Sequence, residues 1–404
     1  MKSNLKYIGP GIVVAATGIG AGDMIAAAVG GGSYGYSILW AVVLGAVLKY
    51  VLNEGIGRWQ LSTGLSIPEA WIKKLPSIFP WYFIIYLIFW SFIVAAALIA
   101  ATGLAAHSLW PILTVNEWGI IHSVLAFVFV MWGNYRRFEI VMKIIIALLF
   151  IIVITSVILI APDLNGVLAG IALPVIKEGS APYVMAIIGG VGGSVTLLSY
   201  GYWISERNWK GRNQLKRIRI DLATAYVLTA VFGIAIVIIS ANLKPEIVKS
   251  SQIVLAMASE MKSTVGSIGS YIFLLGFWGA VTSSMLGVWQ GVPYLFADFV
   301  STWRKENTNI NKLQNTNYYK YFLAFLAFPP VIILYFQKPI WLIMAYSVIG
   351  ALFMPFLAIS LLWLNNKKEW VKKDRNSITI NIILGLTLCL FLYLTTVELM
   401  RIFF

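Results

Sequence analysis

The sequence predicts an all-α polytopic membrane protein, and three observations lead to this fold class. Of its 404 residues, 60% are apolar and 11% are charged, whereas soluble domains carry about 25% charged residues. Apolar runs of about 20 residues, the length that crosses a bilayer, recur along the whole chain. Two of these runs are interrupted by glycine clusters. Because a backbone in lipid must satisfy its own hydrogen bonds, the runs are expected to be helices.

Eleven transmembrane helices are expected, each an apolar run bounded by polar residues. They cover residues 9–31, 35–55, 80–106, 117–134, 138–161, 181–203, 218–241, 267–297, 320–337, 340–364 and 377–400. Residues 246–262 have helical periodicity and are expected to form a helix at the membrane surface. The single cysteine, Cys389, excludes an intramolecular disulfide and a cysteine-based metal site.

The basic residues predict how the chain is oriented in the lipid bilayer. Of thirty Lys and Arg, 22 fall in loops on one side of the predicted membrane, six fall on the other side, and Lys49 and Lys143 lie within spans. The positive-inside rule then places the N-terminus in the cytoplasm and the C-terminus on the outer side of an inner or plasma membrane. The net charge of +14 therefore sets orientation and does not indicate nucleic-acid binding. Lys49 and Lys143 are expected to extend to the inner surface.

Two glycine clusters indicate where a central site would lie. The first span contains "GIGAGD" at residues 18–23 and the sixth contains "GGVGGS" at residues 189–194. Glycine costs about 1 kcal/mol in a helix interior relative to alanine, so both clusters favour unwinding. Paired interruptions of this kind point to the binding site of a transporter, although glycines also allow close helix packing.

The paired clusters also predict how the chain is divided. With five spans in each half, the second half must be inverted relative to the first. We expect a first inverted repeat over residues 1–161, a second over residues 162–364, and an inner loop with the eleventh span over residues 365–404.

Several short motifs resemble those of the Nramp family of divalent-metal transporters, over nearly the whole chain. They are Gly9-Pro10, "GYSILW" at 35–40, "NEGIGRWQLSTG" at 53–64 and "MPF" at 354–356. The resemblance implies an inverted five-plus-five fold of the LeuT type with discontinuous first and sixth helices. It also implies a transporter that needs no cofactor and is not an enzyme.

The resemblance places a substrate site at both clusters, but the usual ligands are missing. The family's Asp-Pro-Gly-Asn falls on Gly20, Ala21, Gly22 and Asp23, and its Met-Pro-His falls on Gly193, Ser194 and Val195. The alanine whose carbonyl binds metal falls on Gly190. The implied substrate-binding residues are Asp23, Gly20, Gly190, Gly193 and Ser194, of which Asp23, Gly20 and Gly190 would contact a metal.

These losses change the expected cargo. Without the soft thioether, only oxygen ligands remain, which suit Mg²⁺, Ca²⁺ or Mn²⁺. A cavity widened by glycine and serine suits Mg²⁺, which keeps several of its waters. Residues 81–106 contain no Asp, Glu, Lys, Arg or His, and a proton path needs a chain of ionisable groups. We therefore expect transport of Mg²⁺ first and Mn²⁺ second, with weak or no proton coupling.

Asp23 is the carboxylate expected to lie deepest, because the other fifteen acidic residues are placed in loops or near span ends. A carboxylate at that depth costs about 2.5–3.5 kcal/mol or more, so it is expected to bind the cation or to cap the following half-helix. Hydroxyls near the clusters, including those of Ser283 and Ser284, are expected mainly to bond backbone carbonyls.

Two other functions stay open. The chain would transport a small organic solute, such as an amino acid or an amine, if Asp23 paired with an ammonium group and the half-helix N-termini bound a carboxylate. It would be a non-transporting, receptor-like relative if the loss of ligands had ended transport. The sequence names no protein partner.

Overall fold

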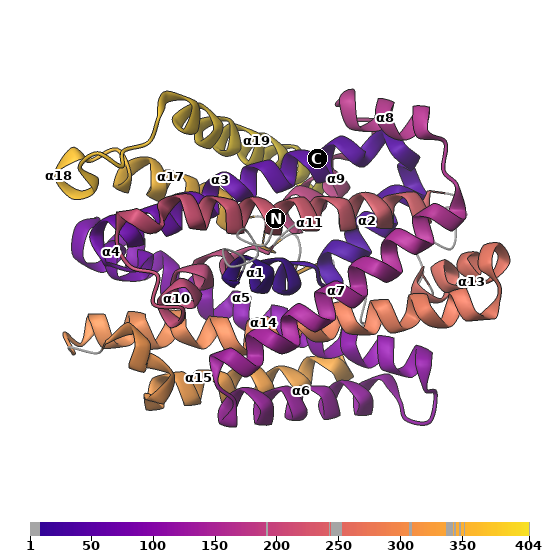
Figure 1. The fold of residues 1–404 in the computed structure, drawn as a ribbon, viewed down its shortest axis with the longest axis horizontal. Helices are drawn as coiled ribbons and strands as arrows, with labels where there is room; N and C mark the ends of the chain where they lie inside the picture. The colour runs from indigo at the N-terminus through magenta and orange to yellow at the C-terminus, as the bar shows by residue number, and fades with distance from the viewer. Residues whose placement is uncertain are drawn as a thin grey trace.

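The computed structural model describes residues 9–190, 193–241, 243, 253–306, 309–336, 342, 345–346, 349–350 and 352–403. Throughout these residues the regular structure is helical, and they contain no strand. Most of the long helices run roughly along the longest axis of the molecule (Figure 1). The all-helical prediction is therefore confirmed for the described residues.

The first half of the chain begins with a divided span. Its elements are α1 (Pro10–Gly18), α2 (Ala21–Tyr34), η2 (Gly35–Ile38), α3 (Leu39–Thr63), α4 (Ile67–Lys74), α5 (Ile78–Leu109), α6 (Val115–Trp132), α7 (Tyr135–Ile160) and α8 (Leu164–Ala172). The short helices α4 and α8 were not predicted.

The second half begins with another divided span. Its elements are α9 (Ala181–Gly190), η3 (Val195–Leu198), α10 (Ser199–Glu206), η4 (Arg212–Gln214), α11 (Leu215–Ser240), α13 (Ile253–Val265), α14 (Ser267–Trp303), η5 (Ile310–Asn315), α15 (Asn317–Ala327), η6 (Pro329–Tyr335), α17 (Phe353–Leu364), α18 (Lys368–Val371) and α19 (Ile378–Phe403). Part of the tenth span and residues 246–252 of the predicted surface helix lie outside the described residues.

Eight helical segments of the described chain are long and apolar enough to cross a membrane, and α17 and α19 contribute shorter apolar helices. One of the eight, Met24–Thr63, joins the end of the first predicted span to the second. The number eleven is therefore not confirmed. The predicted boundaries at residues 161 and 364 fall at the ends of α7 and α17, and the inverted relation of the two halves stays a prediction.

The predicted inner and outer loops lie at opposite ends of the molecule. Figure 1 shows α4 and α18 at one end and α8 and α13 at the other. Ile140, Ile144, Leu148 and Ile151 repeat at helical spacing along α7 and are all exposed, as expected for a helix face in contact with lipid. Which end faces the cytoplasm stays a prediction.

The helix α3 is longer than predicted, because residues 56–63 continue it beyond position 55 to Thr63. The helix ends at Gly64, whose φ of 76° is in the left-handed region that favours glycine. Glu54 and Arg58 lie four residues apart on α3 and form an ion pair of 3.0 Å. Both are buried inside the protein, with exposed fractions of 3% and 1%.

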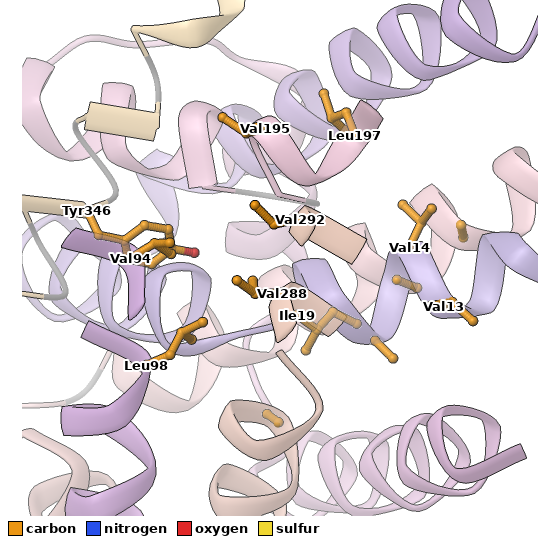
Figure 2. Packing of buried hydrophobic residues seen from close by; sticks show 14 of the residues in the cluster. Val13, Val14, Ile19, Val94, Leu98, Val195, Leu197, Val288, Val292 and Tyr346 are labelled. Atoms are coloured by element: carbon orange, nitrogen blue, oxygen red, sulfur yellow. The ribbon is translucent and has the colours of Figure 1, made fainter. Parts of the chain in front are cut away.

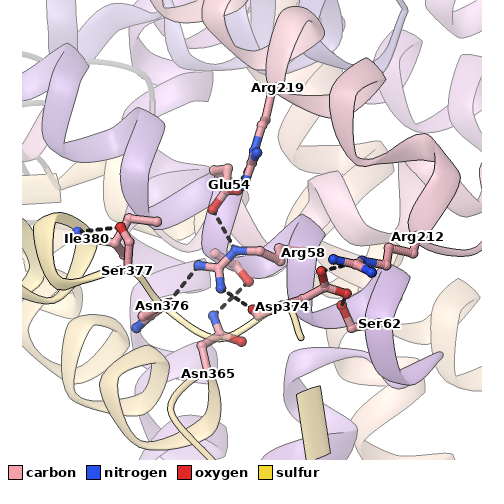
Figure 3. A network of polar contacts seen from close by, with 11 residues as sticks. Glu54, Arg58, Ser62, Arg212, Arg219, Asn365, Asp374, Asn376, Ser377 and Ile380 are labelled. Atoms are coloured by element: carbon pink, nitrogen blue, oxygen red, sulfur yellow. Dashed lines mark hydrogen bonds and ion pairs between the residues drawn. The ribbon is translucent and has the colours of Figure 1, made fainter. Parts of the chain in front are cut away.

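This buried pair belongs to a polar network that ties the chain after α17 to α3 and α11 (Figure 3). Arg58 donates to the carbonyl oxygen of Asp374 and to Oδ1 of Asn376, at 2.6 and 2.7 Å. Arg219 on α11 pairs with Glu54 at 2.9 Å. Each buried charge thus has a partner, as burial of a charge requires.

Three carboxylates that the sequence places in loops or near span ends are buried inside the protein. Glu139, Asp221 and Asp298 are at most 7% exposed. They lie near one end of α7, α11 and α14, as predicted for residues near span ends. Each has a partner from another element, such as Arg207 for Glu139 and Tyr202 for Asp298. Tertiary contacts therefore allow these carboxylates to be buried near helix ends.

Asp221 fastens the beginning of α1 to α11. Its two carboxylate oxygens accept hydrogen bonds from the backbone N–H groups of Gly9 and Gly11, at 2.8 and 2.7 Å. The hydroxyl of Tyr200 on α10 donates to the same carboxylate at 3.1 Å. The first N–H groups of a helix have no partner within it, so this carboxylate acts as the cap that α1 lacks in its own sequence.

Candidate functional site

The first break separates α1 from α2 at Ile19 and Gly20. The backbone N–H of Ile19 donates to the carbonyl of Ala15 at 2.7 Å, which closes the last turn of α1. Gly20 then adopts an extended conformation, with φ −129° and ψ −168°. Its carbonyl accepts from the N–H of Met24 at 3.0 Å and so begins α2. The predicted interruption of the first span is therefore present.

The helix α14 holds this break from one side. Ser283 and Ser284 donate their hydroxyls to the carbonyls of Ala16 and Thr17, at 2.9 and 2.8 Å. These are carbonyls of the last turn of α1, which have no partner within their helix. The two serines bond backbone, as predicted for hydroxyls in this region.

Glycine is required at position 20 by packing and not by its backbone conformation. A Cβ built on Gly20 would overlap Oγ and Cβ of Ser284. The resemblance places the family's metal-binding aspartate at this position, and in this chain Ser284 fills the space of such a side chain. Only the backbone of Gly20 can therefore contribute to a site.

The second break follows α9. Gly190 ends this helix, and η3 begins at Val195. Residues 191 and 192 lie outside the described chain. Gly193 has a φ of 86°, a left-handed conformation that strongly favours glycine, and its N–H donates to the carbonyl of Gly190 at 2.9 Å. The methionine that the family carries at position 193 is thus replaced by a residue that turns the chain.

The two breaks meet at the centre of the molecule. A Cβ built on Gly193 would lie 3.9 Å from Cα of Gly18. The predicted site residues Gly20, Gly190, Gly193 and Ser194 therefore lie at two adjacent interruptions. Asp23 falls within α2, and its side chain lies outside the described part of the structure, so its predicted role stays untested.

Lys49 is a residue at the second break whose position the sequence predicted wrongly. It is 1% exposed, and its Nζ donates to the carbonyl of Gly189 at 2.8 Å and to the carbonyl of Gly193. The prediction that it extends to the inner surface is wrong, because α3 continues to Thr63. About 21 Å of helix therefore separates Lys49 from that end. The only signal in the sequence was one lysine inside an apolar run.

Apolar side chains surround the breaks. Figure 2 shows Ile19 of the first break close to Val288 of α14, with Val94 and Leu98 of α5 nearby. All four belong to one buried cluster. Val94 and Leu98 are apolar, in keeping with the absence of Asp, Glu, Lys, Arg and His from residues 81–106.

Several buried polar groups near the breaks have no hydrogen-bond partner among the described residues. They include Oγ1 of Thr17, Nε1 of Trp90 and Oγ of Ser194. Oγ of Ser194 and Nε1 of Trp90 lie 2.9 and 3.7 Å from the position that a Cβ on Gly350 would take. Buried polar groups are normally satisfied, so these atoms are available to water or to a ligand.

The described residues contain no group of three or more His, Cys, Asp or Glu side chains placed to hold a metal ion. The polar groups described at the breaks are backbone carbonyls, hydroxyls, the ammonium group of Lys49 and the indole N–H of Trp90. Carbonyl and hydroxyl oxygens suit hard cations that keep part of their water shell. An indole N–H only donates and cannot bind a cation.

Known proteins resemble this chain in both sequence and structure. The divalent metal cation transporter MntH of Staphylococcus aureus strain JH9 is 28% identical over 175 residues, which are 41% of this chain and 37% of that protein. The match of strain Newman has the same values. The chain thus matches little more than a third of the length of these relatives.

Solved structures match over almost all of the chain. A histidine mutant of the Eremococcus coleocola manganese transporter has a TM-score of 0.78 at 14% identity, covering 98% of this chain and 86% of that one. MhsT in complex with L-phenylalanine has a TM-score of 0.57 at 15% identity, covering 96% and 97%. At these identities the likeness shows the fold alone, and it confirms the predicted transporter-type fold class.

The family model named Nramp, natural resistance-associated macrophage protein-like, matches residues 11–401. This match confirms the resemblance seen in the short motifs. The many apolar helices of the described chain agree with an integral membrane protein. It also agrees with the prediction that the chain is not an enzyme, because the relatives named above are transporters. The chain belongs to the Nramp family.

Proposed function

We propose that this protein is a secondary transporter that moves a hard divalent cation, Mg²⁺ first and Mn²⁺ second, by alternating access around the paired breaks. One observation carries the proposal: the two glycine breaks, about 175 residues apart in sequence, meet where Gly193 approaches Gly18. Broken helices that meet at the midplane are the usual place of a substrate site in transporters. The printed names of the relatives, a divalent metal cation transporter and a manganese transporter, support this class of cargo.

The cation would be held mainly by oxygen atoms. Asp23 would supply the charge, carbonyls near Gly20 and Gly190 would supply neutral ligands, and water would complete the shell. The carbonyl of Gly190 already accepts one hydrogen bond from Gly193, and a carbonyl has a second lone pair for a ligand. Weak or absent proton coupling is supported by Val94 and Leu98, which make the adjacent part of α5 apolar.

The test is uptake of Mg²⁺ and Mn²⁺ into proteoliposomes containing the wild-type chain, Asp23→Asn or Asp163→Asn. Asp163 caps α8 with its side chain and is exposed, so Asp163→Asn is a matched control with the same loss of charge. Uptake is expected in the wild type and in Asp163→Asn, with a loss of at least about tenfold in Asp23→Asn, the factor that corresponds to 1.4 kcal/mol. Equal uptake by all three proteins would refute the assignment of Asp23.

A small organic solute with a carboxylate is the second candidate cargo, and Lys49 favours it. Its side-chain nitrogen reaches the second break, and Nε1 of Trp90 is a buried donor near Ser194. The indole N–H can donate to a carboxylate and cannot bind a cation, and the positive charge of Lys49 beside the second break disfavours a divalent cation there. MhsT, which shares the fold, was solved with L-phenylalanine. A thermal-shift screen of amino acids against Mg²⁺ and Mn²⁺ salts separates the candidates: stabilisation by an amino acid and by no metal would overturn the cation proposal.

A further inference from the structure

Lys49 contacts both sides of the second break. Its Nζ donates to the carbonyl of Gly189 in the last turn of α9 and to the carbonyl of Gly193 beyond the break. The last carbonyls of a helix have no partner within it and carry about half a negative charge together. The nitrogen of Lys49 thus lies at carbonyl oxygens whose partial negative charge would also attract a free cation.

The glycines are what create these acceptors. Gly193 has a φ of 86°, and this conformation directs its carbonyl to the same nitrogen that the carbonyl of Gly189 reaches. In transporters with broken helices, unwound carbonyls and the C-terminal ends of half-helices hold coupling cations. The acceptors around Lys49 are of both kinds.

The contact is more than an ordinary helix cap. Lys49 comes from α3, a different element, and it is 1% exposed, at a depth where a charged side chain is costly. A cap needs only the end of α9, yet Lys49 also binds Gly193, which lies next to Gly18 of the first break. The contact therefore ties α3 to the point where the two breaks meet.

We propose that the carbonyls of Gly189 and Gly193 form a monovalent cation site and that Lys49 fills it with a tethered ammonium group. The site is distinct from the divalent site proposed above, because its ligands are carbonyls that the side chain of Lys49 already occupies. The tethered ammonium group holds the residues on either side of the second break to α3. The inference does not depend on which solute is transported.

The test replaces the tethered cation with a free one. Lys49→Ala leaves space for a small cation, and Lys49→Gln removes the charge but keeps an N–H donor. The melting temperature of each purified protein is measured in n-propylammonium, Na⁺ or the bulky N-methylglucamine cation at equal ionic strength. Lys143→Ala is the matched control, because Lys143 also lies within a span but is about one-third exposed and pairs with Glu139 at 2.6 Å.

The neutral Lys49 variants are expected to gain stability in n-propylammonium or Na⁺ relative to N-methylglucamine. At a concentration 100 times the Kd the gain is about 3 °C for a chain of this length. The wild type and Lys143→Ala are expected to show no such gain. Equal dependence on cations in all four proteins would overturn the proposal and leave Lys49 as a helix cap. Failure of both Lys49 variants to fold in either small cation would also overturn it.

Transport is measured separately, so the two proposals can fail independently. If the wild type takes up no divalent cation, the proposed function is refuted, while a cation-dependent melting temperature in Lys49→Ala still supports the tethered cation. If the wild type transports and the Lys49 variants show no cation dependence, only the tethered cation is refuted.

Discussion

Replacing Gly20 with alanine tests whether α14 is what requires glycine at the first break. The extended conformation of Gly20 is open to any residue, so the substitution causes no backbone strain. The added Cβ would overlap Oγ and Cβ of Ser284. Either Ser284 rotates and gives up its bond to the carbonyl of Thr17, or the junction between α1 and α2 moves away from α14.

The size of the effect follows from these contacts. Overpacking a buried position costs about 1–3 kcal/mol, and the lost hydrogen bond costs about 1 kcal/mol more. Unfolding entropy of about 2.1 cal/mol/K per residue, over 404 residues, converts this loss into a melting temperature lower by about 2–5 °C.

The assay is the amount of monodisperse protein left after heating, measured by size-exclusion chromatography at one fixed heating time. A fixed time is needed because proteins of this size unfold irreversibly. Gly20→Ala combined with Ser284→Gly removes both obstructing atoms, and the double variant is expected to recover at least half of the loss. Gly385→Ala is the control, because a Cβ on Gly385 in α19 meets no described atom within 4 Å. An unchanged melting temperature in Gly20→Ala, or purely additive losses in the double variant, would refute the reasoning.

Two further predictions concern buried carboxylates. Asp221→Asn directs an amide NH₂ at the N–H groups that begin α1. We expect the free energy of unfolding to fall by about 2–4 kcal/mol, which is measured as a melting temperature lower by about 2–5 °C. Tyr200→Phe removes one of the three donors and is expected to cost less than half as much; the reverse order would contradict the role of Asp221 as a cap. Arg58→Ala leaves Glu54 buried with one partner and is expected to cost about 3–5 kcal/mol. Arg219→Ala removes a half-exposed partner of Glu54 and is expected to lower the free energy of unfolding by under about 1 kcal/mol. Equal losses from the two arginine variants would show that the burial of an arginine does not determine how much its ion pair stabilises the protein.

Local properties of the sequence predicted most of the helical structure. Apolar runs gave the positions of the long helices, and the glycine clusters gave both breaks to within two or three residues. These features depend on residues close together in the sequence. A helix makes its backbone hydrogen bonds within itself, and glycine lowers its stability at any interior position. The end of α3 was misplaced by eight residues, since Arg58 and the other polar residues among 56–63 indicated a loop while their partners were unknown.

Partners distant in sequence were decided only by the tertiary structure. The sequence predicts that Lys49 extends to the membrane surface. In the folded protein its side chain binds Gly189 and Gly193, which are at least 140 residues away in the sequence. Gly20 reads as a helix breaker, yet the need for glycine comes from Ser284 on α14. Residue types and periodicity thus determined that this chain crosses a membrane with two broken helices. The packing of α3 and α14 against those breaks determined which groups occupy them, because burial and pairing of polar groups depend on neighbours that the sequence does not place.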